Sequence, residues 1–152
     1  MLHFAVATKG VLKAAEAANA GLDWVLDKKI TLTFINAGRR DAIVAVCAIP
    51  LIGPNDVIST SFGWQLVRAG ATVAGPVSIQ RFGTDLAFYS YMEGGAETSG
   101  NCGFHVMEGT DGDFVLMGAL SSNPRVLMGH GSLRRVSGDT ARVTDSFTYR
   151  FR

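Results

Sequence analysis

The stretch DAIVAVCAIPLIG, Asp41–Gly53, is the most informative part of this 152-residue chain. Ala42–Ile49 is uninterrupted apolar sequence, and half of its residues are β-branched. Turn-forming residues stand on both sides, at Asn36–Gly38 and at Gly53–Asp56. A run this short and this apolar is typical of a β-strand buried on both faces. The other strands are therefore expected to flank this strand or to cover it.

Turn residues recur every eight to twelve residues from Ile30 onward. The segments between them mostly alternate apolar and polar residues. They are residues 30–35, 57–67, 72–82, 86–92, 102–108, 113–120, 125–128 and 140–151. This spacing predicts a mainly β protein, an antiparallel β-sandwich or barrel of jelly-roll-like form, rather than alternating strands and helices.

Several connections can be predicted as well. Asn36–Asp41 should return residues 30–35 into the central stretch as a hairpin, and residues 109–112 should form the turn of another hairpin. Gly63 marks a possible site for a β-bulge. Glu93–Asn101 holds three glycines and no large apolar residue, which is typical of a surface loop.

The first 28 residues are expected to form an arm, and residues 29–152 the β-sandwich of a single globular domain. Within the arm, His3–Thr8 is predicted to be a strand. Gly10–Leu26 has apolar residues at spacings of three and four, so it is predicted to be the one short helix. Trp24 is a candidate anchor at a subunit interface, because large aromatic side chains bury much area at little entropic cost.

The composition favours self-association. Apolar residues make up 47% of the chain and charged residues 18%, whereas about 25% of residues are charged in a typical soluble domain. A domain of this size has much surface and few charges to cover it. Either the exposed surface is rich in Gly, Ser, Thr and Ala, or part of it is buried against other copies, and the second explanation is favoured.

The net charge is only +1, but the charges are unevenly distributed. An acidic segment contains Glu93, Glu97, Glu108, Asp111 and Asp113. An arginine-rich end contains Arg125, Arg134, Arg135, Arg142, Arg150 and Arg152. Solvated loops and an exposed strand face account for this pattern in the simplest way. The alternative is that the two segments of different subunits meet, a head-to-tail contact that builds rings or filaments.

No metal, cofactor or catalytic set is expected. His105, Glu108, Asp111 and Asp113 are weak candidates for metal ligands, since no second histidine stands at ligand spacing and the loop lacks the register of an EF-hand. Nucleic acid is an unfavoured partner, because strand alternation places the C-terminal arginines opposite the aromatic residues Tyr149 and Phe151.

Cys47 and Cys102 lie in apolar strand patterns and are predicted to be core thiols rather than a disulfide. No secretory signal and no apolar run of about 20 residues is visible, which predicts synthesis in the cytoplasm and no membrane segment.

The low charge, the many Gly, Ala and Thr residues and the strand-rich pattern resemble the composition of viral capsid, tail or decoration subunits, without a shared motif. The sequence thus predicts a non-enzymatic, homo-oligomeric subunit of a larger assembly such as a virion. The alternative is a β-barrel that binds a small ligand or a carbohydrate, with or without metal-dependent catalysis, at the strand end that carries His105, Glu108 and Asp111.

Overall fold

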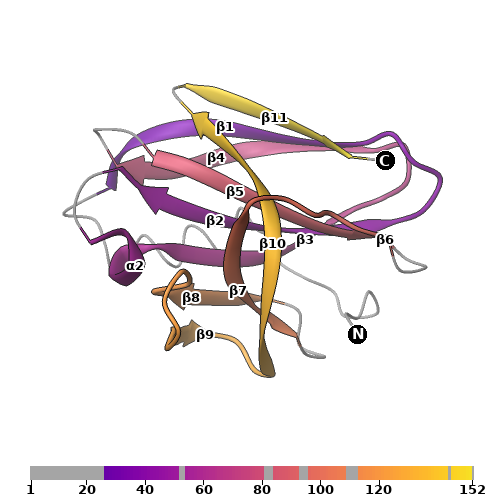
Figure 1. Ribbon diagram of the computed structural model, residues 1–152. Helices are drawn as coiled ribbons and strands as arrows, with labels where there is room; N and C mark the ends of the chain where they lie inside the picture. Colours follow the sequence, from indigo (N-terminus) through magenta and orange to yellow (C-terminus); the bar gives the residue numbers. More distant parts are fainter. Residues whose placement is uncertain are drawn as a thin grey trace.

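The computed structural model describes residues 26–51, 54–80, 84–92, 96–108, 113–143 and 145–151 (Figure 1). Two β-sheets and one short helix make up this part of the chain, so the prediction of a mainly β sandwich or barrel is confirmed. The elements are β1 (Leu26–Asn36), β2 (Ala42–Pro50), α2 (Asn55–Ile58), β3 (Thr60–Val67), β4 (Thr72–Gln80), β5 (Thr84–Met92), β6 (Ala96–Glu97), β7 (Cys102–Glu108), β8 (Phe114–Met117), β9 (Arg125–Met128), β10 (Ser132–Val143) and β11 (Ser146–Phe151).

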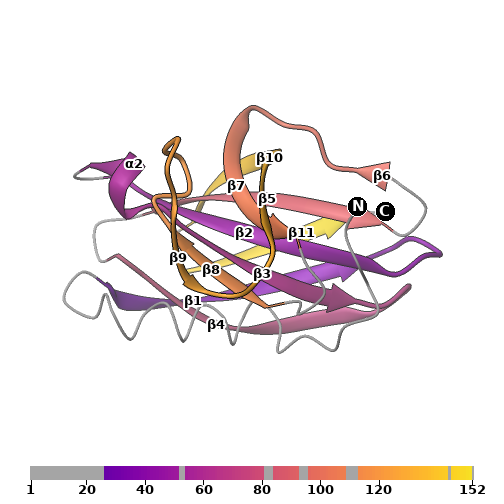
Figure 2. The ribbon, with the colours of Figure 1, turned by 90° about the horizontal axis from the view of Figure 1, so that it is seen from below.

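The smaller sheet has three strands in the order β11-β1-β4, with β1 parallel to β11 and antiparallel to β4. The larger sheet has eight strands in the order β7-β10-β5-β2-β3-β8-β9, and β6 pairs with the end of β5. The larger sheet is antiparallel throughout and curls into a half-barrel (Figures 1 and 2).

The central apolar stretch is β2, and it is buried on both faces as predicted. Its side chains alternate between two cores. Val44 and Val46 pack against the three-stranded sheet, whereas Ile43 and Ala45 face the hollow of the half-barrel. All six residues from Ala42 to Cys47 are no more than 2% exposed. The unbroken apolar run thus reflects a strand that has no solvent face.

The half-barrel is closed by two side-chain hydrogen bonds and one backbone hydrogen bond rather than by a continuous ladder. The outer edge of β7 receives hydrogen bonds from Ser61 Oγ to the His105 carbonyl (2.7 Å) and from Trp64 Nε1 to the Met107 carbonyl (3.0 Å). The His105 amide donates to the Ala119 carbonyl at 2.8 Å. These contacts satisfy backbone groups that an edge strand would otherwise present to solvent.

The bulge predicted at Gly63 is present. Val44 pairs with Gln65 and Val46 pairs with Phe62, so β3 carries one residue more than β2 at this point. The extra residue reverses the alternation, and Trp64 turns into the hollow although Phe62 faces the other core. The predicted strand over residues 57–67 is too long, because Val57 and Ile58 belong to α2.

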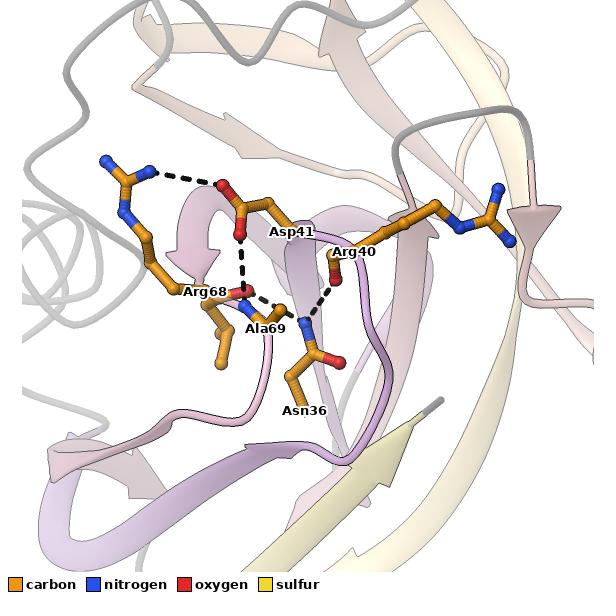
Figure 3. Close-up of polar contacts among 6 residues, drawn as sticks. Asn36, Arg40, Asp41, Arg68 and Ala69 are labelled. Atoms are coloured by element: carbon orange, nitrogen blue, oxygen red, sulfur yellow. Dashed lines mark hydrogen bonds and ion pairs between the residues drawn. The ribbon is translucent and has the colours of Figure 1, made fainter.

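The hairpin predicted at Asn36–Asp41 is wrong, because β1 and β2 belong to different sheets. The Asn36 side chain explains the difference. Its amide donates to the carbonyls of Arg40 (2.8 Å) and Val67 (3.0 Å), and its Oδ1 accepts from the Gly38 amide at 2.9 Å. The buried Asn36 therefore fixes a corner at which the chain changes sheets (Figure 3).

The return crossing from β3 to β4 lies beside this corner. The Asp41 carboxylate accepts from the Ala69 amide at 3.0 Å and from Arg68 at 3.1 Å (Figure 3). The backbone of Asn36 also exchanges hydrogen bonds with Gly70 and Ala71. The crossing from β1 to β2 and the crossing from β3 to β4 thus stabilise each other through these hydrogen bonds. A pattern of turn residues cannot reveal such contacts.

Two further pairings differ from the predicted ones. The strands β7 and β8 do not form a hairpin, because β7 pairs with β10 while β8 pairs with β3 and β9. The predicted final strand over residues 140–151 is divided into β10 and β11, which lie in different sheets. Its predicted apolar face is nevertheless right, since Ala141, Val143, Phe147 and Tyr149 all contribute to the core between the sheets.

The predicted strand at residues 3–8, the helix at 10–26 and the turn at 109–112 lie outside the described residues, except for Leu26. The structure places Leu26 at the start of β1, ahead of the predicted boundary at residue 29.

Candidate functional site

An ion-pair cluster lies on the concave side of the half-barrel, where β5, β6, β7 and β10 meet. Arg134 donates from Nη2 to Glu97 Oε1 at 2.7 Å and from Nη1 to Glu108 Oε1 at 3.0 Å. We call Arg134, Glu97, Glu108 and Tyr89 the Arg134 cluster. Two residues of the acidic segment and one arginine of the arginine-rich end thus pair within one chain. The alternative reading of the sequence placed such contacts between different subunits.

Strand register explains why these residues converge. Arg134 lies opposite Val106, so Glu108 is its diagonal neighbour on the same face of the β7–β10 ladder. Glu97 lies opposite Tyr91 on β5, two residues from Tyr89. Thr98 holds the end of β6 in place, because its hydroxyl accepts from the Ser90 amide at 3.2 Å and contacts Ser90 Oγ.

Tyr89 lies beneath these charges. The residue is 1% exposed and packs in the hollow, and its ring makes an edge contact with Trp64 at 6.0 Å between centroids. Burial raises the pKa of Tyr89 well above its usual range, so the phenol remains a donor. The buried hydroxyl lies beside the Glu97 carboxylate, and the interaction between these two groups also raises the pKa of Tyr89 and lowers the pKa of Glu97.

The charged members are partly exposed. The side chains of Arg134, Glu97 and Glu108 are 33%, 38% and 21% exposed. The hydrogen bond from Arg134 lowers the pKa of Glu97, and the same bond raises the pKa of Arg134. Both groups are therefore charged at neutral pH, and the cluster with its two carboxylates and one guanidinium has a net charge of about −1.

The candidate metal ligands do not form a cation site in the part of the chain that the structure describes. No group of three or more His, Cys, Asp or Glu side chains converges there. The Nδ1 atom of His105 lies 3.1 Å from the Ala119 carbonyl, and Glu108 binds Arg134. Asp113 directly precedes β8, and Asp111 lies outside the described residues.

The other residues predicted for an interface are spread over the surface. Arg135 is exposed on β10, Arg142 makes an exposed pair with Asp85 at 3.4 Å, and Arg150 is exposed on β11 in the smaller sheet. Glu93 and Trp24 lie outside the described residues. The arginines of this end that the structure describes are therefore divided between two sheets and form no single stripe.

An apolar border is a second candidate site that the sequence pattern did not predict. Among the described residues, the large apolar side chains that are exposed are Val57 (60%), Val126 (44%), Leu127 (39%) and Leu133 (44%). They lie on α2, on β9 and at the start of β10, which follow one margin of the molecule (Figure 1). Gly118 directly follows β8, and Ser59 directly follows α2. The Gly118 amide donates to the Ser59 carbonyl, so this bond links α2 to β8, the strand that pairs with β9.

Both cysteines are free thiols, as predicted. Cys47 is buried in β2, and Cys102 is half-buried at the start of β7. Burial raises the pKa of both thiols, which leaves them protonated and poorly nucleophilic at neutral pH. Neither thiol is therefore a candidate nucleophile.

No family model, no curated protein and no solved structure matches this chain. Among the described residues, no helix is long and apolar enough to cross a membrane.

Proposed function

We propose that this protein is a non-enzymatic, self-associating structural subunit, and that copies of it join along the apolar border. The supporting observation is that all the exposed large apolar side chains of the described chain gather on α2, β9 and the start of β10. Isolated exposed apolar residues are common, but their grouping on one margin marks an interaction surface.

The strand β9 supplies the chemistry for this contact. It is the last strand in the order of the larger sheet, so its outer backbone groups face away from the ladder with β8. An unpaired strand edge is a template for another extended strand. Pairing of β9 with β9 of a second copy in antiparallel fashion would set Val126 beside Leu127 and keep the two Arg125 side chains at opposite ends.

Membership in a larger assembly such as a virion is the second part of the proposal. The low share of charged residues, 18%, and the compositional resemblance to capsid, tail or decoration subunits support it. A contact through one short edge would make dimers, and further contacts would then be needed to build a shell or a tube.

The test is the mass of the protein in solution, measured by light scattering after size exclusion. We expect the wild type to exceed its monomer mass of 16.1 kDa. Leu127→Lys should give the monomer, because an edge lysine prevents strand pairing and charges the border. Thr148→Lys adds the same charge at an exposed position of β11 and should keep the wild-type mass. A monomeric wild type, or a Leu127→Lys variant that retains the wild-type mass, would contradict the proposal.

A further inference from the structure

Four exposed arginines gather at the end of the molecule where the chain crosses between the sheets. The crossing from β1 to β2 carries Arg39 and Arg40, and the crossing from β3 to β4 carries Arg68. Arg150 lies at the same end, because β11 runs parallel to β1 and Arg150 pairs with Ile35. We call these four arginines the basic corner. They come from three distant parts of the chain, so the sequence pattern did not predict this group.

The basic corner stands on a fixed backbone. The amide of Asn36, which is 1% exposed, donates to the carbonyl of Arg40 at 2.8 Å (Figure 3). The same amide donates at 3.0 Å to the carbonyl of Val67, the residue before Arg68. One buried side chain thus holds both crossings in place. The arginines therefore project from a base that needs little ordering when a partner binds.

Positive charge dominates this end of the molecule. The two crossings, residues 37–41 and 68–71, contain one acidic residue, Asp41, which pairs with Arg68 at 3.1 Å. The side chain of Arg68 is nevertheless 73% exposed. The other three arginines take part in no ion pair among the described residues. Glu97 on the neighbouring β6 is bound within the Arg134 cluster. Four guanidinium groups therefore face solvent against one nearby free carboxylate.

The layout of the basic corner fits an extended anion better than a single phosphate. Figure 3 shows the side chains of Arg40 and Arg68 leaving the corner in opposite directions. Diverging side chains cannot close on one phosphate, whereas a chain of phosphates can contact both. Guanidinium groups bind phosphate oxygens through paired N–H donors. A nucleic acid presents such phosphates at short, regular intervals.

We propose that the basic corner binds the phosphate backbone of nucleic acid, independently of base sequence. Each guanidinium pairs with a backbone phosphate and releases a counterion. The sequence disfavoured nucleic acid at the last strand because base stacking would need aromatic residues on the arginine face. Contacts to the backbone need no aromatic side chain. The proposal does not depend on the apolar border or on self-association.

Two other partners fit the basic corner less well. An anionic membrane is bound best when apolar side chains accompany the positive charges. All the exposed large apolar side chains of the described residues lie instead on the apolar border. A second copy of the chain would need a matching acidic face. The exposed acidic residues that the structure describes are spread over α2, β6, β10 and the turn before β11: Asp56, Glu97, Asp139 and Asp145.

Fluorescence anisotropy of labelled DNA tests the proposal, with a duplex and with single-stranded oligo(dT) as separate probes. We expect binding with a dissociation constant in the micromolar range at low salt. Four phosphate contacts should weaken duplex binding by roughly 100-fold between about 50 and 200 mM salt. Binding to neither probe at low salt would overturn the proposal. Tighter binding to vesicles of phosphatidylcholine and phosphatidylserine than to DNA, at equal phosphate concentration, would also overturn it.

A pair of double variants locates the site. Arg39→Gln with Arg40→Gln should weaken duplex binding by about tenfold at low salt and reduce the slope of log K against log salt by about 2. Arg125→Gln with Arg142→Gln removes the same charge from the other end of the larger sheet, where β3 and β5 begin, and should bind as the wild type does. An equal loss in both double variants would show that net charge alone binds the DNA, and would overturn the proposal.

Asp41→Asn tests the proposal in the opposite direction. This substitution removes the carboxylate of the two crossings and releases Arg68 from its ion pair. The amide oxygen can still accept from the Ala69 amide, which the Asp41 carboxylate binds at 3.0 Å. The affinity for the duplex should therefore rise by about threefold at low salt. A general loss of structure cannot produce such a gain. Binding no tighter than that of the wild type would overturn the proposal.

Discussion

The guanidinium of Arg134 on β10 donates a hydrogen bond of 2.7 Å to the carboxylate of Glu97 on β6, 37 residues away in the sequence. The same guanidinium bonds Glu108 on β7 at 3.0 Å. Opposite charges that composition suggested for contacts between subunits are thus already in contact within one chain. Contacts between subunits would have to use other charged residues of the acidic segment and the arginine-rich end, or share Arg134, Glu97 and Glu108.

The Arg134–Glu97 pair should make stability depend on pH in the acid range. The pKa of Glu97 is lowered in the folded protein, mainly by the hydrogen bond from Arg134. Its contribution is therefore complete above the unfolded value of about 4.3 and is lost as pH falls through the folded pKa. Urea midpoints measured from neutral pH to about pH 3 should fall less for Glu97→Gln than for the wild type.

The control for this prediction is Arg134→Gln. Without the guanidinium the pKa of Glu97 has lost its main cause of depression, so adding Glu97→Gln to Arg134→Gln should change the acid dependence little. An equal effect of Glu97→Gln on the acid dependence in both backgrounds would show that Arg134 does not lower the pKa of Glu97.

Asn36→Asp should destabilise the corner between the two sheets by about 3 kcal/mol. The Asn36 amide donates to two carbonyls, and the residue is 1% exposed. A carboxylate at position 36 would lack the N–H donors of the Asn36 amide, and its oxygens would face the carbonyl oxygens of Arg40 and Val67. Urea unfolding measures the change. Asn123→Asp, in an exposed turn, should stay within about 0.5 kcal/mol of the wild type.

Gly138→Ala should destabilise the protein by about 2 kcal/mol. Gly138 lies where β10 passes from β7 to β5, and an added Cβ would stand 2.5 Å from the Phe88 carbonyl oxygen and 2.9 Å from the Phe104 ring. The carbonyl belongs to the backbone of a central strand, so it cannot move aside cheaply. Chemical denaturation of Gly138→Ala and of the exposed neighbour Ser137→Ala should separate this clash from a general effect on β10.

Charge reversal at Arg135 should weaken self-association, and more so at low salt. Arg135 is exposed two residues from Leu133 on the same face of β10, at the rim of the apolar border. Charges at an interface rim act mainly through screened electrostatics. Light scattering of Arg135→Glu at low and high salt measures the effect. An unchanged mass at low salt would remove this electrostatic contribution.

Arg134→Glu serves as the contrast to Arg135→Glu. Arg134 binds two carboxylates in its own chain, so its reversal should destabilise the fold, whereas Arg135→Glu should change the free energy of unfolding by no more than about 0.5 kcal/mol. The double reversal of Arg134 and Arg135 would mix the two effects. Loss of assembly in that variant alone would therefore not identify an interface.

Local apolar patterning was sufficient to predict which faces of β2 and β5 are buried. The unbroken run in β2 indicated a strand without a solvent face, and the two apolar faces of β5 point into the two cores as their alternation suggests. The apolar set of residues 140–151 is buried as well, although the chain changes sheets within it. Burial follows from side-chain chemistry and a period of two, and both can be read from neighbouring residues.

Strand pairing and the sites depended on contacts between distant residues. The Asn36 amide finds the Val67 carbonyl 31 residues away, which turns an apparent hairpin into a crossing between sheets. The curl that brings β7 back to Trp64 makes one face of β5 concave, and only then does Tyr89 lie beneath Arg134, Glu97 and Glu108. Turn residues show that the chain reverses direction, but long-range hydrogen bonds and sheet curvature set where it returns. The amino-acid pattern therefore specified which residues of β2 and β5 are buried, and tertiary contacts specified which distant residues come into contact.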